Sequence, residues 1–429
     1  MKIIKCHRLY LCILTLIICI SLSAQSINDT SSIIWKEGYL DIHHINTGRG
    51  VATFMVMPDG TKMVIDLGDM NDVRSKGSLP LTVTAAYPDK SKNSGEWVID
   101  YINQVFPNQI NPSIDYALLT HFHGDHYGII REGLQKSLTG NYYLSGLTQL
   151  GDVLKIKNWI DRDYPNYNFP IDLRAVYGKE GAGFDNLLKF LDYQKINNGL
   201  KLSSLKVGYN NQIVLTNNPI KYPSFKIIGV KANGTIWTGN GTETIQHFTS
   251  DSILSLKSSF NENPLSLALK VTYGKFDYFT GGDNTGLQGY GLPKWFDVET
   301  PMAKAVGKVE VTTLDHHGNR DGTNEFFLKT LQPKAVVEQT WCSDHPGQEV
   351  MHRLLSDYLY PGEKNVFATN IQEATKQTLG FWFTNGYKSM FGHVIVRVLP
   401  GGDKFYVLIA ETIDGKIIIK KKFGPFDSE

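Results

Sequence analysis

Hydrophobic and polar positions along this chain follow two alternating patterns. In the first third, short β-rich apolar runs flank one stretch whose apolar residues recur at helical spacing. The pattern predicts strands at 39–46, 51–57, 62–65 and 115–119 and a helix at 96–106. The turn Pro58-Asp59-Gly60 joins the second and third strands. Strands and helices alternate, which is typical of an α/β protein.

The middle of the chain differs from its flanks. Residues 131–215 contain two predicted helices, at 152–161 and 184–194, with polar turns between them, so we interpret this region as a helical insertion. After it, the pattern predicts strands at 224–230, 265–272, 276–280, 309–314, 335–337 and 366–369, with helices at 324–331 and 347–359.

The tail of the chain predicts more β-structure. Runs at 393–399, 405–410 and 416–422 alternate like a hairpin plus one strand, so we expect a C-terminal β-strand extension over 378–429. The lysines at 420–422 could suggest a nucleic-acid patch, but a solvated edge strand explains them better.

The first 24 residues have the pattern of a secretory signal peptide. Lys2, Lys5 and Arg8 precede a 14-residue apolar run, and the small residues before Gln25 end it. The run is shorter than the ~20 residues that cross a bilayer. We therefore expect cleavage after residue 24, no stable membrane anchor, and a periplasmic or secreted protein.

Composition limits the function in two ways. The chain has 43 Lys+Arg against 42 Asp+Glu, so its surface as a whole does not attract polyanions, and any polyanion must be bound locally. Three of its four cysteines lie within the predicted signal peptide, which leaves Cys342. An exported chain with one cysteine forms no internal disulfide, so its stability must come from its core and from bound metal.

Ligand-type side chains stand where four of the predicted strands end. These ends read Asp66-Leu67-Gly68, Thr120-His121-Phe122-His123-Gly124-Asp125-His126, Gly281-Gly282-Asp283 and Asp315-His316-His317-Gly318. They contain five of the 12 histidines, and α/β proteins place their sites at such strand ends. A nucleophilic triad is less well supported, because the sequence shows no serine elbow and no cysteine near these segments.

A divalent metal explains this arrangement best. Neutral imidazole and carboxylate hold Zn²⁺ or Mn²⁺, and His121 and His123 can point into one coordination sphere. Asp125 and His126 begin the next turn and can face a second ion, while Asp283 can bridge both.

The run from His121 to His126 resembles the central motif of the metallo-β-lactamase superfamily. Within it, the chain resembles the secreted or periplasmic hydrolase domain related to ComEC-type competence proteins. That second resemblance rests on Pro58-Asp59-Gly60 leading to Asp66-Leu67-Gly68, Asn263-Pro264-Leu265 leading to Gly281-Gly282-Asp283, His316-His317-Gly318-Asn319, and His345-Pro346. It implies an αβ/βα sandwich, two sheets face to face with helices outside, in a domain over 37–370.

The resemblance also implies roles for individual residues. It assigns His121 and His123 to a first metal, Asp125, His126 and His317 to a second, and Asp283 to both. Asp125 and Asp283 are the candidate catalytic residues. Asp66 is expected to orient the ligands from behind, and His316 and His345 to lie behind them or to contact substrate. One or two divalent ions are implied, Zn²⁺ first, with Mn²⁺ or Fe as alternatives.

The chain departs from the family pattern at three places. The family at large supplies a further histidine between the central motif and the bridging aspartate, and His247 stands alone in that interval in an unmatched context. Either His247 or a water would complete the first site. Related sequences usually carry acids where Asn46 and Val51 stand, and commonly a serine where Asn319 stands.

The predicted function is therefore that of an exported, metal-dependent hydrolase. A metal ion lowers the pKa of a bound water from 15.7 toward ~7, so that hydroxide forms at neutral pH. The ComEC-like resemblance implies phosphodiesters as substrates, with nucleic acid among the candidates. Two alternatives stay open: an ester, lactone or amide hydrolase on the same fold, and a non-catalytic binding module whose first metal site stays empty.

Overall fold

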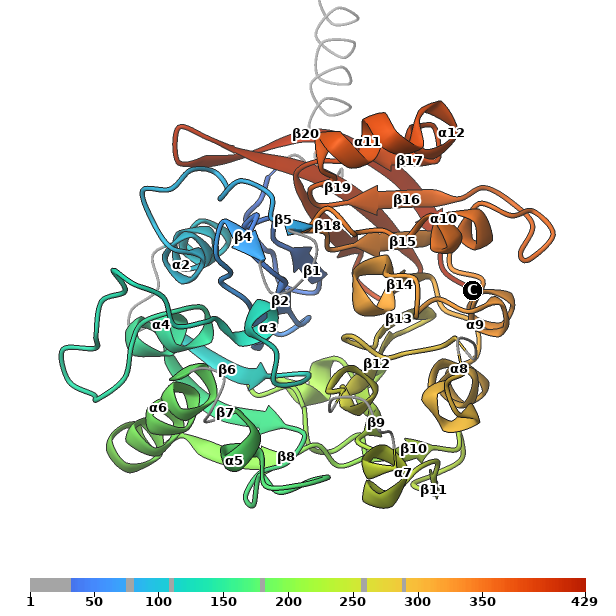
Figure 1. Cartoon of the computed structure of the whole chain (residues 1–429). Coiled ribbons are helices and arrows are strands. Elements are labelled where there is room, and N and C mark those ends of the chain that lie inside the picture. The colour runs from blue at the N-terminus through green and yellow to red at the C-terminus, as the bar shows by residue number, and fades with distance from the viewer. Residues whose placement is uncertain (1–31, 75–80, 108–111, 178–181, 256–260, 288–290) are drawn as a thin grey trace, which may run out of the picture. The chain divides into compact units, whose positions relative to one another are not determined.

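The apolar runs of the sequence form two nine-stranded sheets in the computed structural model (Figure 1). The first sheet has the order β20-β19-β18-β1-β2-β3-β6-β7-β8. Its strands are β1 (Leu40–His44), β2 (Ala52–Val56), β3 (Lys62–Leu67), β6 (Ser113–Leu118), β7 (Lys155–Asp161), β8 (Lys201–Ser204), β18 (His393–Val398), β19 (Lys404–Ile413) and β20 (Lys416–Asp427).

The second sheet has the order β11-β10-β9-β12-β13-β14-β15-β16-β17. Its strands are β9 (Phe225–Ala232), β10 (Thr235–Trp237), β11 (Thr244–Gln246), β12 (Ala268–Tyr273), β13 (Phe276–Thr280), β14 (Val311–Thr313), β15 (Ala335–Glu338), β16 (Asn365–Ala368) and β17 (Tyr387–Ser389). A separate pair consists of β4 (Val73–Arg74) and β5 (Leu81–Thr82).

Helices connect the strands. The α-helices are α2 (Ser94–Val105), α3 (Gly124–Tyr127), α4 (Leu147–Val153), α5 (Leu173–Tyr177), α6 (Ala182–Asn198), α7 (Ser250–Leu254), α8 (Glu299–Val306), α9 (Glu325–Leu331), α10 (Gln348–Leu354), α11 (Glu373–Leu379) and α12 (Phe381–Thr384). Short 3₁₀ turns are η1 (Pro219–Lys221), η2 (Asn263–Leu265), η3 (Lys294–Phe296) and η4 (Asp315–Gly318).

The two sheets share one core between them. Ile42 of β1 and Leu269 of β12 belong to the same cluster of buried apolar side chains, although they lie on different sheets. On the other face of the second sheet, Val336 of β15 packs in a cluster with Leu328 of α9 and Val350 of α10. Because successive strand residues point to opposite faces, these clusters bury both faces of the second sheet.

The first sheet is covered in the same way. Trp159 of β7 meets Phe190 of α6 at 6.4 Å between ring centroids, and His43 of β1 meets Tyr101 of α2 at 5.5 Å. In Figure 1, α2, α4 and α6 lie beside the first sheet, and α8, α9 and α10 beside the second. The architecture is the αβ/βα sandwich that the resemblance implied.

One predicted helix is wrong. Residues 155–161 of the segment 152–161 form strand β7, which pairs with β6 in parallel register. Lys155 and Lys157 are exposed while Ile156 between them is buried, which is the alternation of a strand. The region 131–215 thus supplies β7 and β8 to the first sheet as well as helices.

The other predicted helices and strands are present in the structure, although the first or last residues of most of them differ from the predicted ones. The helix predicted at 184–194 is α6, and the helix predicted at 347–359 ends earlier, at Leu354. The C-terminal strands β18, β19 and β20 extend the first sheet beside β1, and β20 lies at its edge. The lysines at 420–422 are exposed on that edge strand, as predicted.

The structure describes residues 32–74, 81–107, 112–177, 182–255, 261–287 and 291–429. The predicted signal peptide lies outside these ranges. Residues Ile34–Glu429 form one unit, to which every element above belongs. Within the described ranges, no helix combines the length and the apolar character needed to span a membrane.

Candidate metal centre

Four loops from the two sheets form the candidate site. β3 and β6 are parallel neighbours in the first sheet, and β13 and β14 are parallel neighbours in the second, so each pair ends at one edge. Gly282 lets the two edges meet. Its φ is +58°, and a Cβ at this position would lie 2.9 Å from the Thr120 side chain, so the loop of Asp283 needs glycine here.

The first group of candidate ligands is His121, His123 and Asp283. Their ligand atoms all lie within 4.8 Å of one another. His121 Nε2 is 3.0 Å from His123 Nδ1 and 3.6 Å from Asp283 Oδ2. The structure therefore brings together the residues that were predicted for the first metal.

The second group is Asp125, His126, Asp283 and His317, all buried, with ligand atoms again within 4.8 Å of one another. His317 Nε2 lies 3.1 Å from Asp125 Oδ2 and 3.4 Å from Asp283 Oδ2. His126 Nε2 lies 3.2 Å from Asp283 Oδ1. Asp283 belongs to both groups, which is the position that the sequence predicted for a bridging carboxylate.

Asp66 fixes the second group from behind. Its carboxylate accepts hydrogen bonds from the backbone N–H of Thr120 at 2.8 Å and from the Thr120 hydroxyl at 2.7 Å. It also accepts one from His126 Nδ1 at 2.8 Å, which leaves Nε2 of that ring facing Asp283. These hydrogen bonds are the ones that the predicted orienting role of Asp66 requires, and the role itself stays a prediction.

The residues fit a divalent cation. His126 Nε2 is buried and has no hydrogen-bond partner within the described residues, although two carboxylates lie 3.2 and 3.5 Å away. Such an atom is costly to bury unless it binds something. Imidazole nitrogen and carboxylate oxygen together suit Zn²⁺, and also Mn²⁺ or Fe.

The charges of the site favour cation binding. Burial alone would raise the pKa of Asp125, but attraction to His126 and the hydrogen bond and charge of His317 outweigh it and hold the pKa well below its ordinary value. Burial holds the pKa of His121 well below its ordinary value, so this imidazole is neutral. The charged carboxylate of Asp125 and the neutral ring of His121 are therefore already in the protonation state that binds a metal ion.

His126 and His317 carry protons when no metal is present. Burial lowers their pKa, but the carboxylates around them outweigh it, so the pKa of His126 is well above its ordinary value and that of His317 is about 9. Among the groups that raise the pKa, Asp283 makes the largest contribution to both histidines. Metal binding at the second group must therefore displace protons.

His316 and His317 point to different places although they are adjacent. Both have positive φ, +50° and +55°, which is unusual outside glycine. His317 Nδ1 donates to the Gln339 carbonyl at 3.0 Å, which turns Nε2 to the second group. His316 Nδ1 instead lies 2.5 Å from Asp321, and its Nε2 is 3.9 Å from Asp283, outside both ligand groups of the described residues.

His345 lies beside the second group. Its ring stacks on His317 with centroids 4.6 Å apart, and it meets the Trp341 ring edge-on at 5.3 Å. Both of its nitrogens are buried without a hydrogen-bond partner in the described part of the chain. Its ring thus stacks on that of His317, and the two predicted roles, support of the ligands from behind or contact with substrate, stay predictions.

His247 joins neither ligand group among the residues described. It follows β11, and its ring lies against Phe248. The alternative that His247 completes the first site gains no support. Thr120 was missed by the sequence reasoning: its hydroxyl lies 3.1 Å from His121 Nδ1 and also bonds Asp66. Its position directly before His121 was the available signal.

Comparison with known proteins adds little to this site. No protein-family model matches the chain, and no curated protein matches it either. Among solved structures, the chain is similar to the Zn²⁺-bound PqqB of Methylobacterium extorquens, with 9% identity and a TM-score of 0.39 over 83% of this chain and 99% of that one. The assignment below therefore rests on the residues of this chain.

Proposed function

We propose that this chain is a metal-dependent hydrolase that cleaves phosphodiesters. The observation that carries the proposal is the carboxylate of Asp283, which belongs to two buried groups of metal-ligand side chains at once. When bound, a pair of divalent ions supplies Lewis acidity and activates water, which suits displacement at phosphorus. The ComEC-like motifs of the sequence favour phosphodiesters over other esters.

The chain's own residues would position the reaction. His121, His123 and Asp283 hold one side of the site, and Asp125, His126 and His317 hold the other. His126 Nδ1 donates a hydrogen bond to Asp66, and this bond fixes the orientation of the His126 ring. The carboxylates of Asp66, Asp125 and Asp283 are buried, so few water molecules can compete with substrate for the ligand groups.

His316 is the group that we assign to proton transfer. Burial lowers its pKa, but the hydrogen bond to Asp321 and the charge of Asp283 outweigh this and raise it above its ordinary value. Its side chain is 15% exposed, more than any ligand of the second group. A protonated imidazole at the mouth of the site can protonate the leaving oxygen.

The test is hydrolysis of bis(p-nitrophenyl) phosphate by the purified protein with Mn²⁺ or Zn²⁺. This substrate has a good leaving group, so it needs no general acid. Asp283→Asn should abolish most activity, because it removes the shared charge at nearly constant volume. The matched control is Asp277→Asn, six residues earlier on β13 and paired with Lys270 away from both groups; it should keep most activity.

Other outcomes would assign the site differently. Turnover of an ester, lactone or amide without diester cleavage under any metal would replace the phosphodiesterase by the hydrolase alternative. Failure on all four substrate classes, with less than one metal per chain, would favour the binding-module alternative. Equal loss in Asp283→Asn and Asp277→Asn would contradict the role of Asp283.

We also propose that the protein is exported, with its substrate outside the cytoplasm. The basis is the basic start, the 14-residue apolar run and the small residues before Gln25. N-terminal sequencing of the protein from the periplasm or medium should begin at or near Gln25. An intact Met1 on membrane-bound protein would contradict export by cleavage.

A further inference from the structure

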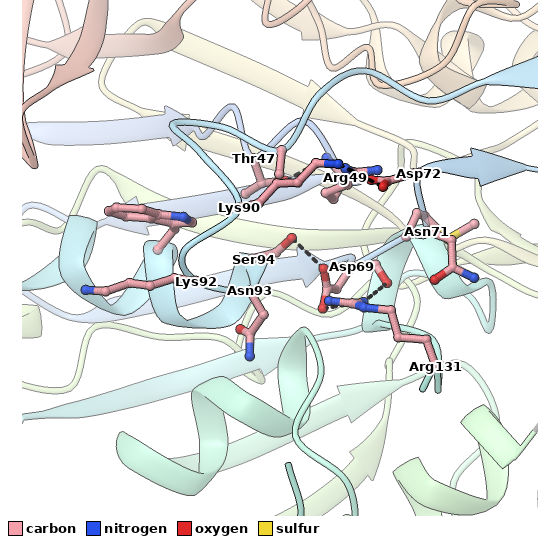
Figure 2. A pocket seen from close by; sticks show the side chains of 13 residues that line it. Thr47, Arg49, Asp69, Asn71, Asp72, Lys90, Lys92, Asn93, Ser94 and Arg131 are labelled. Carbon is pink, nitrogen blue, oxygen red and sulfur yellow. Dashed lines mark hydrogen bonds and ion pairs between the residues drawn. The ribbon is translucent and has the colours of Figure 1, made fainter. Parts of the chain in front are cut away.

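Figure 2 shows the side chains that line a charged cavity of about 240 Å³. It is far larger than the ~10–15 Å³ that one water needs. Four cationic side chains line it, together with two aspartates and the first residues of α2. The cations are Arg49, Lys90, Lys92 and Arg131, and the acids are Asp69 and Asp72.

The cavity adjoins the second ligand group through the backbone. The N–H of Val51, two residues after Arg49, donates to the Asp125 carbonyl at 2.9 Å. A Cβ at Gly68 would lie 1.9 Å from that same carbonyl, so the loop that leads to Asp69 also touches it. The walls of the cavity and the ligand Asp125 are therefore parts of one packed unit.

The two acids of the cavity have different roles. The Asp69 side chain is 1% exposed, accepts a hydrogen bond from Ser94 Oγ at 2.9 Å and forms an ion pair with Arg131 Nη1 at 2.8 Å. It is a fixed anchor that holds Arg131 at the wall. Asp72 is 60% exposed and pairs with both Arg49 and Lys90. It is therefore an exposed carboxylate held between two cations, as Figure 2 shows.

Arg49 has unused binding capacity. Its side chain is 7% exposed, and its Nη1 is buried without a hydrogen-bond partner in the described parts of the chain. A buried guanidinium N–H without an acceptor carries a free-energy penalty that a ligand oxygen would remove. The planar fork of arginine binds phosphate with two parallel hydrogen bonds, so a phosphate is the ligand that fits it best.

We propose that this cavity binds a phosphate group of the substrate that flanks the one being cleaved. The proposal rests on the phosphodiesterase function above and names its substrate class as a chain of several phosphodiesters. Without substrate, the Asp72 carboxylate occupies the position of that phosphate between Arg49 and Lys90. The substrate phosphate displaces this carboxylate when it binds. Binding by a local cluster also suits a chain whose total charge is close to zero.

The test compares an oligothymidylate, which has flanking phosphates, with bis(p-nitrophenyl) phosphate, which has none. Arg49→Gln should raise KM for the oligonucleotide about tenfold and leave kcat and the small diester unchanged. Asp72→Asn should lower KM for the oligonucleotide, because it removes the competing carboxylate. A misfolded variant cannot gain affinity, so this second variant guards against damage to the fold. The control Lys421→Gln, on the exposed edge of β20, should match the wild type.

Equal effects of Arg49→Gln on both substrates, or no effect on either, would overturn the proposal. If neither substrate is cleaved, the proposed function fails, and binding of labelled oligothymidylate then tests the cavity alone. Asp72→Asn should bind the oligonucleotide most tightly, the wild type less tightly and Arg49→Gln most weakly. Equal binding by all three proteins would overturn the proposal. Inorganic phosphate is the other source of the same group. Tighter binding of inorganic phosphate than of oligonucleotide would also overturn the assignment to a substrate phosphate.

Discussion

His317 should make the stability of the metal-free protein depend on pH above neutrality. Its ring is buried among Asp283, 3.4 Å away, and Asp125, 3.1 Å away, and these carboxylates raise its pKa to about 9 against burial. In the unfolded chain its pKa returns to the ordinary value of ~6.5. The folded state thus binds a proton more tightly than the unfolded state does.

The direction in which stability changes with pH follows from that difference in pKa. A pKa raised by folding contributes stability that is fully present below ~6.5 and is lost as pH rises through about 9. A pKa difference of about 2.5 corresponds to about 3 kcal/mol from His317 alone, at 1.36 kcal/mol for each unit. Folding raises the pKa of His126 as well, so the observed loss of stability can exceed the contribution of His317.

The assay is urea unfolding in chelator at several pH values between about 6 and about 10. Across this pH range, the free energy of unfolding of the wild type should fall by about 3 kcal/mol more than that of His317→Gln. His352→Gln, on the exposed face of α10, is the control and should lose as much as the wild type. Parallel curves for wild type and His317→Gln would refute the pairing of His317 with the two carboxylates.

Three further predictions concern single side chains. His126→Ala should reduce the metal bound per chain by elemental analysis, whereas the control His316→Ala should not; unchanged metal content in His126→Ala would refute the second ligand group. Asp66→Asn should weaken metal affinity roughly 10–100-fold in a chelator titration, because it orients His126, and wild-type affinity would contradict that role. Asp41→Asn should destabilise the protein by about 3–5 kcal/mol in urea, because it leaves buried Arg397 without its ion pair; a loss below about 1 kcal/mol would show that the pair is dispensable.

The ligand cluster could be predicted from the sequence because its members follow strands directly. His121, His123, Asp125 and His126 lie within six consecutive residues, so the end of one strand places them together. Asp283 and His317 follow strands of the other sheet, and the meeting of the two sheets was needed to bring them there. The pattern indicated strand ends, and the resemblance supplied the pairing of sheets.

The errors have physical causes as well. The segment 152–161 has apolar residues that fit both a helix and a strand, and parallel pairing with β6 decided for the strand from residue 155 onward. The charged cavity was not predicted, because Arg49, Lys90 and Arg131 are far apart in the sequence. Isolated basic residues have no periodic pattern, so tertiary contacts alone reveal their convergence.

The most direct test of the central claim is a crystal structure of the purified protein with Zn²⁺, with data collected at the zinc absorption edge. The account predicts two anomalous peaks, one among His121, His123 and Asp283 and one among Asp125, His126, His317 and Asp283. Asp283 should contact both peaks. A zinc-loaded crystal with no peak at these side chains, or with peaks only elsewhere on the chain, would contradict the account.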